Sequence, residues 1–401
     1  MLSETEARQL ILERSPRGPE IRVPLTESLG RRTTRALVAT CDLPGFDNSS
    51  MDGYAVRAAE AVRGARLRLA GVQPAGPDQG LCLAQGEAIR IFTGAPLPAG
   101  ADAVVMQEDT RAEDSHVVIL EDSVAGEFVR RRGADLCVGQ ILLSPGDRIR
   151  AAGLGLLASQ GMETVPVVEA PRVAIVTTGD ELHPIGTGIP LGPGQIHDSN
   201  GPLLTAVARH FGAVSTCNHA PDEPARLRAI LEQVMHDADF VWIAGGVSVG
   251  DRDFVRPCLE ELGCVSEFWR VRIKPGKPFL FARREDGPLV FGLPGNPVSA
   301  FVTALLFAVP SLEHWNLVVP SPDFPPLQRF RSRLLTTLTN PGDRPHYLRA
   351  WHDSAEGTLR PAGLQESHAL AGLSRANALI RLEAGATVES GSEITAFALD
   401  F

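Results

Sequence analysis

Two lysines stand out among the residues that could do chemistry. The chain has 38 lysines and arginines, and Lys274 and Lys277 are the only lysines. Both lie in the short segment 273–278, in which proline and glycine separate them. A lysine ammonium is a compact, strongly hydrated point charge and arginine is a planar fork, so the two are not interchangeable at a binding site. In a chain that otherwise uses arginine, this pair indicates a phosphate site that requires ammonium groups.

Five loops rich in glycine and proline follow predicted strands. They comprise residues 177–181, 220–222, 245–253, 274–277 and 293–299. In an open parallel sheet the ligand binds beyond the carboxyl ends of the strands, and a glycine-rich loop that enters a helix presents free N–H groups to an anion. The loop residues that we expect to bind the ligand are Gly245, Gly246, Ser248, Gly250, Pro294, Asn296, Pro297 and Ser299.

The same loops carry carboxylates. These are Asp180, Glu181, Asp222, Asp251 and Asp253. Acidic side chains beside a phosphate usually indicate a bridging divalent cation, typically Mg²⁺ with few protein ligands. Asp222, Asp253 and Glu181 are our candidates for metal ligands, although Asp222 and Asp253 could instead cap the helices that follow them.

A serine hydrolase is an alternative interpretation of one loop. Residues 246–250 satisfy G-x-S-x-G, the pattern of a nucleophile elbow, and Ser248 could form a triad with Asp343 and His368. Asp251 and Asp253 would, however, place negative charge near the developing oxyanion. The two lysines would also have no function, so we favour the phosphate site.

The pattern around these loops alternates between strands and helices. We expect strands at 172–177, 213–217, 239–244, 265–271, 279–282 and 289–293, and helices at 202–211, 224–235, 254–262 and 297–309. Asp222 is positioned to cap the helix at 224–235. Such alternation predicts a mostly parallel sheet with helices on both faces.

Different patterns flank this α/β unit. Apolar spacing predicts a helix at 4–14, continued helical structure through 20–38, and another helix at 149–163. Short alternating apolar runs between residues 41 and 139 predict a β-rich unit. A proline-rich linker then leads to short β runs that predict a small barrel or sandwich. The fold class is therefore α/β and multidomain.

Composition excludes several classes of protein. The net charge of −10 does not suit general binding to nucleic acid or to an anionic membrane. The six cysteines show no C-x-x-C spacing, which argues against zinc and against a disulfide framework. The acidic first residues, without an apolar stretch, lead us to expect no signal peptide, and the apolar helix expected at 297–309 would be too short to cross a bilayer. We expect a cytoplasmic protein without a nucleic-acid or membrane partner.

Taken together, these and further segments resemble the MoeA family, the molybdopterin molybdenumtransferases, to which the E domain of gephyrin is related. The matching segments are residues 50–55, 90–96, 103–108, 130–135, 178–182, 194–200, 245–253, 273–278 and 293–300. They follow the family's order over nearly the whole chain. Ser50 and His197 depart from the family pattern, which more often has alanine and tyrosine there, so the effect of His197 near the pterin is open.

The resemblance implies four domains in each subunit. Domain I, a small helical and mixed domain, would comprise residues 1–40 and 140–168, and the β-rich domain II, residues 41–139, would be inserted into it. Domain III, residues 169–318, would be the α/β molybdopterin-binding domain, similar to that of the adenylylating MogA proteins. Domain IV, residues 319–401, would be a β barrel. The family is dimeric, and its cleft lies between domain III of one subunit and the inserted domain of the other.

The resemblance also implies a reaction, namely insertion of molybdate into adenylylated molybdopterin with release of AMP and dependence on Mg²⁺. The implied catalytic residues are Asp52, Thr93, Glu181, Asp222, Asp253, Lys274 and Lys277. Arg349 and Ser367, with His368, would bring the last domain to the cleft. Molybdopterin adenylyl transfer, insertion of tungstate and a purely structural scaffold remain alternatives. The implied partners are a second subunit, the molybdopterin adenylyltransferase and molybdoenzyme chaperones.

Overall fold

The computed structural model of the protein describes residues 1–247, 253–316 and 327–399. The chain forms two compact units. Unit 1 comprises residues 1–34, 145–149 and 164–401, and unit 2 comprises residues 35–144 and 150–163. This division is coarser than the four domains that we expect, whose boundaries stay a prediction.

The centre of unit 1 is a six-stranded sheet in the order β16-β13-β17-β20-β19-β18. Its strands are β13 (Arg172–Thr178), β16 (Val214–Ala220), β17 (Phe240–Ala244), β18 (Val265–Trp269), β19 (Leu280–Arg283) and β20 (Leu289–Leu293). Strands β16, β13, β17 and β20 are parallel, whereas β19 and β18 are antiparallel to their neighbours. The predicted mostly parallel sheet is therefore confirmed.

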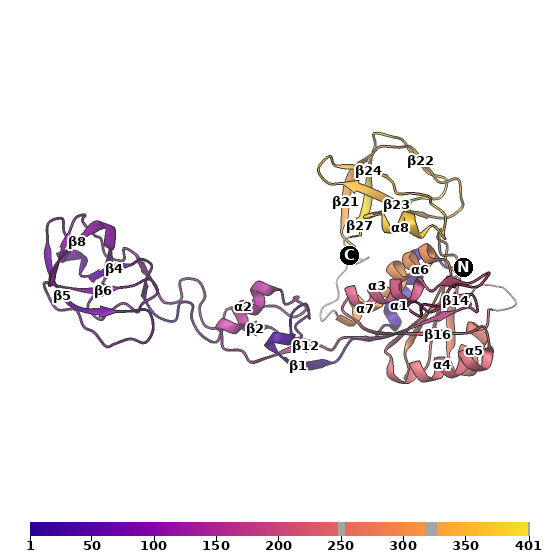
Figure 1. The fold of residues 1–401 in the computed structure, drawn as a ribbon, viewed down its shortest axis with the longest axis horizontal. Coiled ribbons are helices and arrows are strands. Elements are labelled where there is room, and N and C mark those ends of the chain that lie inside the picture. Colours follow the sequence, from indigo (N-terminus) through magenta and orange to yellow (C-terminus); the bar gives the residue numbers. More distant parts are fainter. Residues whose placement is uncertain (248–252, 317–326, 400–401) are drawn as a thin grey trace. The chain divides into compact units, whose positions relative to one another are not determined.

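Both faces of strands β13, β17, β19 and β20 are buried because alternate residues of these strands pack into different cores. Phe240 and Trp242 of β17 belong to one core, and Val241 and Ile243 to the other. The first core receives α1 (Glu4–Arg14), α3 (Asn200–His210) and the helical segment 297–316. The second core receives α4 (Pro224–Asp237) and α5 (Val255–Glu261). Figure 1 shows these two groups of helices on opposite faces of the sheet.

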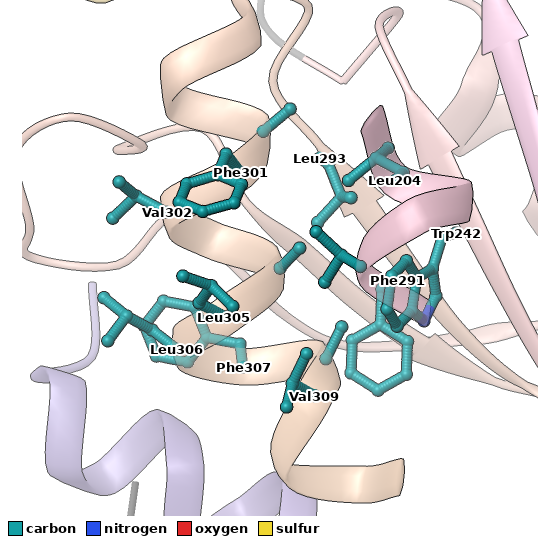
Figure 2. Close-up of a cluster of buried hydrophobic side chains, with 14 of the residues drawn as sticks. Leu204, Trp242, Phe291, Leu293, Phe301, Val302, Leu305, Leu306, Phe307 and Val309 are labelled. Carbon is teal, nitrogen blue, oxygen red and sulfur yellow. The ribbon is translucent and has the colours of Figure 1, made fainter. Parts of the chain in front are cut away.

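The helical segment 297–316 is longer than predicted. It consists of α6 (Pro297–Thr303), a π-helical turn η4 (Ala304–Ala308) and α7 (Val309–Asn316). Our prediction that it ends at residue 309 was wrong because Pro310 lies within the helix, which continues for two further turns. Its length and composition would allow it to cross a membrane, but 89% of its most apolar 18-residue stretch is buried inside the protein. Figure 2 shows Phe301, Leu305 and Phe307 of this segment among the core side chains of unit 1.

Two local predictions were also wrong. Residues 20–24 form strand β1 (Glu20–Pro24), which pairs with β12 (Thr164–Val168), and they do not continue the first helix. The β-branched Ile21 and Val23 suit this strand, whose partner is far away in the sequence. Asp222 does not cap α4, since the N-cap residue is Glu223 and its side chain makes no capping hydrogen bond.

The last part of unit 1 is a closed five-stranded barrel. Its strands, in order around the barrel, are β21 (Arg329–Leu334), β24 (Thr358–Pro361), β23 (His346–Asp353), β25 (Ala378–Leu382) and β27 (Glu393–Ala398). Leu348, Leu359 and Ile380 fill its interior. Between β24 and β25 the chain forms a loop and the short helix α8 (Leu370–Ser374).

Unit 2 is β-rich, as predicted. Its six-stranded sheet has the order β7-β4-β6-β5-β9-β8. The strands are β4 (Gly53–Val56), β5 (Arg66–Gln73), β6 (Glu87–Ile91), β7 (Ala103–Met106), β8 (Thr110–Glu113) and β9 (His116–Ile119). The unit also contains the paired strands β2 (Leu37–Val38) and β11 (Ile141–Leu143), and helix α2 (Ala151–Ser159).

Candidate active site

The main candidate site is a cavity of about 820 Å³ at the carboxyl ends of β13, β17 and β20. Residues that follow these three parallel strands line it, which is the position where open α/β sheets bind ligands. Eight of the predicted ligand-binding and metal-binding residues contribute to the lining: Glu181, Asp222, Gly245, Gly246, Asp253, Pro294, Asn296 and Pro297. His368 also lines it. The sheet therefore brings most of the predicted site together.

Glycine is required in the loop that follows β17. Gly245 has a φ of +101°, and a Cβ atom there would lie 2.6 Å from the Thr178 hydroxyl oxygen. Gly246 has a φ of +64°, and its Cβ would lie 2.8 Å from a methyl group of Val255. Both the backbone conformation and the close packing exclude a larger residue. The loop backbone consequently approaches the end of β13 closely and faces the cavity.

The start of α6 is connected to the segment that precedes α8. The Asn296 side-chain amide donates a hydrogen bond to the Ser367 hydroxyl at 3.0 Å, and the Val298 N–H donates to the Ser367 carbonyl at 3.1 Å. On the other side, the Asn200 amide donates to the Gly295 carbonyl at 2.7 Å. These bonds hold the loop 293–299 at the cavity wall, and they place Ser367 beside it.

The three predicted metal ligands line the cavity, but they do not form a ready-made metal site. Asp222 and Asp253 are half-buried and Glu181 is exposed. Among residues 1–247, 253–316 and 327–399, no group of three or more histidine, cysteine, aspartate or glutamate side chains is arranged to hold a metal ion. Mg²⁺ is usually bound through one or two carboxylates together with water and substrate phosphates. The oxygen donors at this cavity fit that mode of binding.

The two lysines lie beside the cavity and not in its lining. Both side chains are exposed, and Pro278, the next residue after Lys277, lines the cavity. The loop backbone is held by the barrel, because the Lys274 N–H donates to the Pro345 carbonyl at 2.8 Å and the Tyr347 N–H donates to the Lys274 carbonyl at 2.7 Å. These two hydrogen bonds, one from the Lys274 N–H and one to the Lys274 carbonyl, fix the backbone from which the Lys274 side chain extends.

Arg349 and Ser299 are buried behind the cavity. The Arg349 guanidinium donates to the carbonyls of Glu366 and Leu364, and burial lowers its pKa. It therefore supports the segment that carries Ser367. Ser299 is only 4% exposed and lies in the first turn of α6. Neither side chain contributes to the cavity lining.

Asp52 and Thr93 are joined in unit 2. One Asp52 carboxylate oxygen accepts the Thr93 N–H at 2.7 Å and the Thr93 hydroxyl at 2.9 Å. These two hydrogen bonds, with the nearby charge of Arg90, hold the Asp52 pKa below its usual value. The Arg90 guanidinium lies 5.1 Å from the ring centres of both Tyr54 and Phe92, and it donates to the Gly53 carbonyl. Unit 2 thus presents an ionised, well-supported carboxylate at its surface.

Two other predicted ligand-binding residues, Ser248 and Gly250, lie outside the described residues.

Comparison with known proteins identifies the family. Residues 2–161 match the MoeA N-terminal region (domain I and II), residues 174–314 a probable molybdopterin binding domain, and residues 331–399 the MoeA C-terminal region (domain IV). A molybdopterin molybdenumtransferase 2 of Mycobacterium tuberculosis (strain ATCC 25618 / H37Rv) is 38% identical over 394 residues, which are 95% of each chain. The chain belongs to the MoeA family.

Other MoeA proteins agree with this assignment. The molybdopterin molybdenumtransferase of Synechococcus elongatus is 37% identical over 389 residues, which cover 90% of this chain and 96% of the relative. The crystal structure of a molybdopterin biosynthesis MoeA protein from Pyrococcus horikosii covers 100% of both chains with a TM-score of 0.85 and 28% identity. The similarity therefore extends over the whole MoeA fold.

Sequence reasoning missed several residues that support the MoeA site. Asp198 accepts hydrogen bonds from the Thr177 hydroxyl at 2.8 Å and from the Gly201 N–H at 2.9 Å, and it lines the cavity. Gln365 exchanges hydrogen bonds with the Arg349 backbone. The position of Asp198 in the segment 194–200, between a loop and a helix, was the available signal. Gln365 had no such signal, because it lies in the loop after β24 and its partner Arg349 lies on β23.

Proposed function

We propose that this MoeA protein inserts molybdate into adenylylated molybdopterin and releases AMP, as a step of molybdenum cofactor biosynthesis. The observation that supports this most is the cavity at the carboxyl ends of the parallel strands. There the glycine loop at 245–246, the start of α6 and three carboxylates line one space. An anion-binding loop beside carboxylates is the arrangement that a phosphate-containing substrate needs.

The protein's own residues act by binding and by balancing charge. Because the Gly245 N–H donates to the Leu293 carbonyl and the Val298 N–H to the Ser367 carbonyl, the Gly246 N–H is the backbone donor of this loop that holds a phosphate oxygen. Lys274 and Lys277, exposed beside the cavity, balance the charge that develops on the departing AMP. Donors fixed before the reaction stabilise such charge well because they need little reorganisation. Ser367, held by Asn296 at the cavity wall, donates a hydrogen bond to a ligand oxygen.

Asp222, Asp253 and Glu181 would hold Mg²⁺ together with a phosphate of the substrate. The bound ion would neutralise phosphate charge and polarise the bond to AMP. Glu181, the most exposed of the three, also orients water or the oxyanion at the mouth of the cavity. Since no three acidic, histidine or cysteine side chains of the described residues are arranged around one point, these carboxylates act together with the ligand and not as a closed cage.

We further propose a cytoplasmic homodimer in which Asp52 and Thr93 of one subunit complete the site of the other. The support for this is chemical. Asp52 and Thr93 form an ordered polar pair at the surface of unit 2, and both hydrogen bonds from Thr93 use the same carboxylate oxygen of Asp52.

The test is to supply purified protein with adenylylated molybdopterin and Mg²⁺ and to measure AMP. We expect AMP release that depends on molybdate and that is lost in Lys274→Ala, while the variant keeps its oligomeric state. Molybdate-independent hydrolysis would contradict the proposal, and so would ATP consumption with free molybdopterin. A parallel reaction with tungstate measures the preference between the two oxyanions.

A further inference from the structure

A second cavity in unit 1 is built from arginines and has no part in the proposed reaction. Its volume is about 680 Å³. Four of its lining residues are Arg31, Arg32, Arg148 and Arg209, so a quarter of the 16 residues that line it are arginine. In the whole chain, lysine and arginine together account for 38 of 401 residues. The concentration of guanidinium groups is therefore local.

The backbone places three of these arginines side by side. Arg32 and Arg148 are partners in an antiparallel bridge, and the Ile149 N–H donates to the Arg31 carbonyl at 2.8 Å. The side chains are also tethered, because Arg31 Nε donates to the Glu27 carbonyl at 3.2 Å and Arg148 Nε donates to the Gly30 carbonyl at 3.0 Å. Tethering through Nε leaves the outer N–H groups of each guanidinium available to a ligand.

The arginines outnumber the carboxylates that could neutralise them. Glu313 pairs with Arg32 at 3.3 Å, and Glu27 is the other acidic residue of the lining. Four arginines and two glutamates give the lining a formal charge of +2, in a chain whose net charge is −10. Within the described part of the chain, Arg31, Arg148 and Arg209 have no carboxylate partner. Like charges that line one cavity repel one another, and an anion bound among them would offset the repulsion.

The Arg209 side chain does not interact with the carbonyl groups at the end of α3. Basic residues at a helix C-terminus often interact with the last carbonyls. Here the Gly212 N–H occupies the Arg209 carbonyl and the Phe211 N–H occupies the Val207 carbonyl. Arg209 Nε instead donates to the Ser215 hydroxyl at 3.1 Å. Its guanidinium is thus held at the cavity.

We infer that this arginine cavity binds a phosphate monoester with an organic body, at a site separate from the one proposed for molybdopterin. A phosphate monoester carries about −1.5 to −2 charges at neutral pH, which matches the lining charge. Guanidinium forks suit its oxygens. Val168, Ala170 and Phe211 provide an apolar wall for the organic part, and the volume lies in the usual range for small-molecule sites.

The test uses AMP as the probe, by calorimetric titration of the full chain. Because AMP would also bind at the proposed active site, the titration is done in the Lys274→Ala/Lys277→Ala background. We expect AMP to bind to the arginine cavity of this variant, and adenosine to bind to it at least tenfold more weakly than AMP. Adding Arg148→Gln and Arg209→Gln should weaken AMP binding at least tenfold. The control pair Arg226→Gln and Arg331→Gln, exposed arginines of the same unit, should leave it unchanged.

Arg209→Gln alone serves as a second variant, since glutamine can keep the hydrogen bond to Ser215. The hydrogen bond from Arg148 to the Gly30 carbonyl is unchanged in this variant. We expect it to weaken AMP binding severalfold with an unchanged thermal midpoint. Equal binding of adenosine and AMP would overturn the inference. AMP binding that is insensitive to these arginines would do so as well. Neither result bears on molybdate-dependent AMP release by the wild-type protein, so the two proposals can fail independently.

Discussion

One carboxylate oxygen of Asp52 accepts two hydrogen bonds from Thr93, which lies 41 residues further along the chain. The pair joins the loop before β4 to the loop after β6. Since both bonds use the same oxygen, the second oxygen has no partner among the described residues and is available to a ligand. The bonds also favour the ionised form, so Asp52 remains a carboxylate well below neutral pH.

Removal of the Thr93 hydroxyl tests this relationship. Thr93→Ala deletes one of the two bonds, and we expect kcat/KM for molybdate-dependent AMP release to fall roughly fivefold to tenfold, the effect of about 1 kcal/mol. Thr93→Ser keeps the hydroxyl and should retain most of the activity. If the serine and alanine variants are equally impaired, the hydroxyl does not act through Asp52.

A shared site predicts complementation between inactive subunits. Asp52→Asn alters unit 2 and Lys277→Ala alters unit 1, so a mixed dimer would contain one site with neither change. Random mixing of equal amounts should restore roughly a quarter of the wild-type rate of AMP release. No recovery after verified subunit exchange would show that each site is complete within one chain.

Substitution of Gly245 should damage the candidate site specifically. Gly245→Ala places a methyl group 2.6 Å from the Thr178 hydroxyl oxygen, in a backbone conformation that alanine disfavours. We expect loss of AMP release and a lower thermal midpoint. Gly263→Ala is the matched control, because Gly263 also has a positive φ but nothing lies within 4 Å of the added Cβ. Equal effects in the two variants would exclude close packing as the cause.

His346 predicts a pH dependence of stability. Burial, with the charges of Lys274 and Arg349, lowers its pKa from 6.5 to about 4. The unfolded chain therefore binds more protons between these values, so this contribution to stability is complete above pH 6.5 and is lost as the pH falls towards 4. We expect a loss on the order of 1 kcal/mol between pH 7 and pH 5, after allowance for solvent screening.

Urea denaturation at the two pH values measures this loss. His346→Gln should reduce the difference between pH 7 and pH 5, whereas His236→Gln, which changes an exposed residue of α4, should not. A His346→Gln variant with the same pH dependence as the wild type would contradict the assignment.

The first helix is attached to the barrel by a buried ion pair. Glu4 is 7% exposed and accepts a hydrogen bond from Arg381 at 3.0 Å. Glu4→Gln removes the charge and leaves Arg381 partly buried, so we expect a loss of about 2 kcal/mol in the free energy of unfolding. Glu13→Gln, at an exposed position of the same helix, should cost under 0.5 kcal/mol, as surface changes usually do. Similar urea midpoints for both variants would argue against the pair.

Much of the fold could be predicted from local pattern. The strand at 240–244 was assigned correctly because all its residues are apolar, and the helix at 4–14 because Leu10 and Ile11 lie among charged residues at helical spacing. Strand β1 was missed since its partner β12 lies about 140 residues away, and nothing near residues 20–24 indicates that pairing.

The candidate site was predictable to the same extent. Strand order collects Gly245, Asn296 and Asp222 at one edge, which general rules for parallel sheets anticipate. The support of Lys274 by the backbone of β23, and of Ser367 by Arg349, depends on contacts between the barrel and the α/β sheet. Contacts between such distant segments produce no periodic pattern of apolar residues in the sequence.

The pairing of β1 with β12 affects the order of events during synthesis. Val23 pairs with Val165, and at ~5–20 residues per second a ribosome needs roughly 7 to 30 seconds to make the intervening chain. Most of unit 2 emerges within that interval and can fold first. Strand β1 must therefore stay without its partner until residues 164–168 have been made.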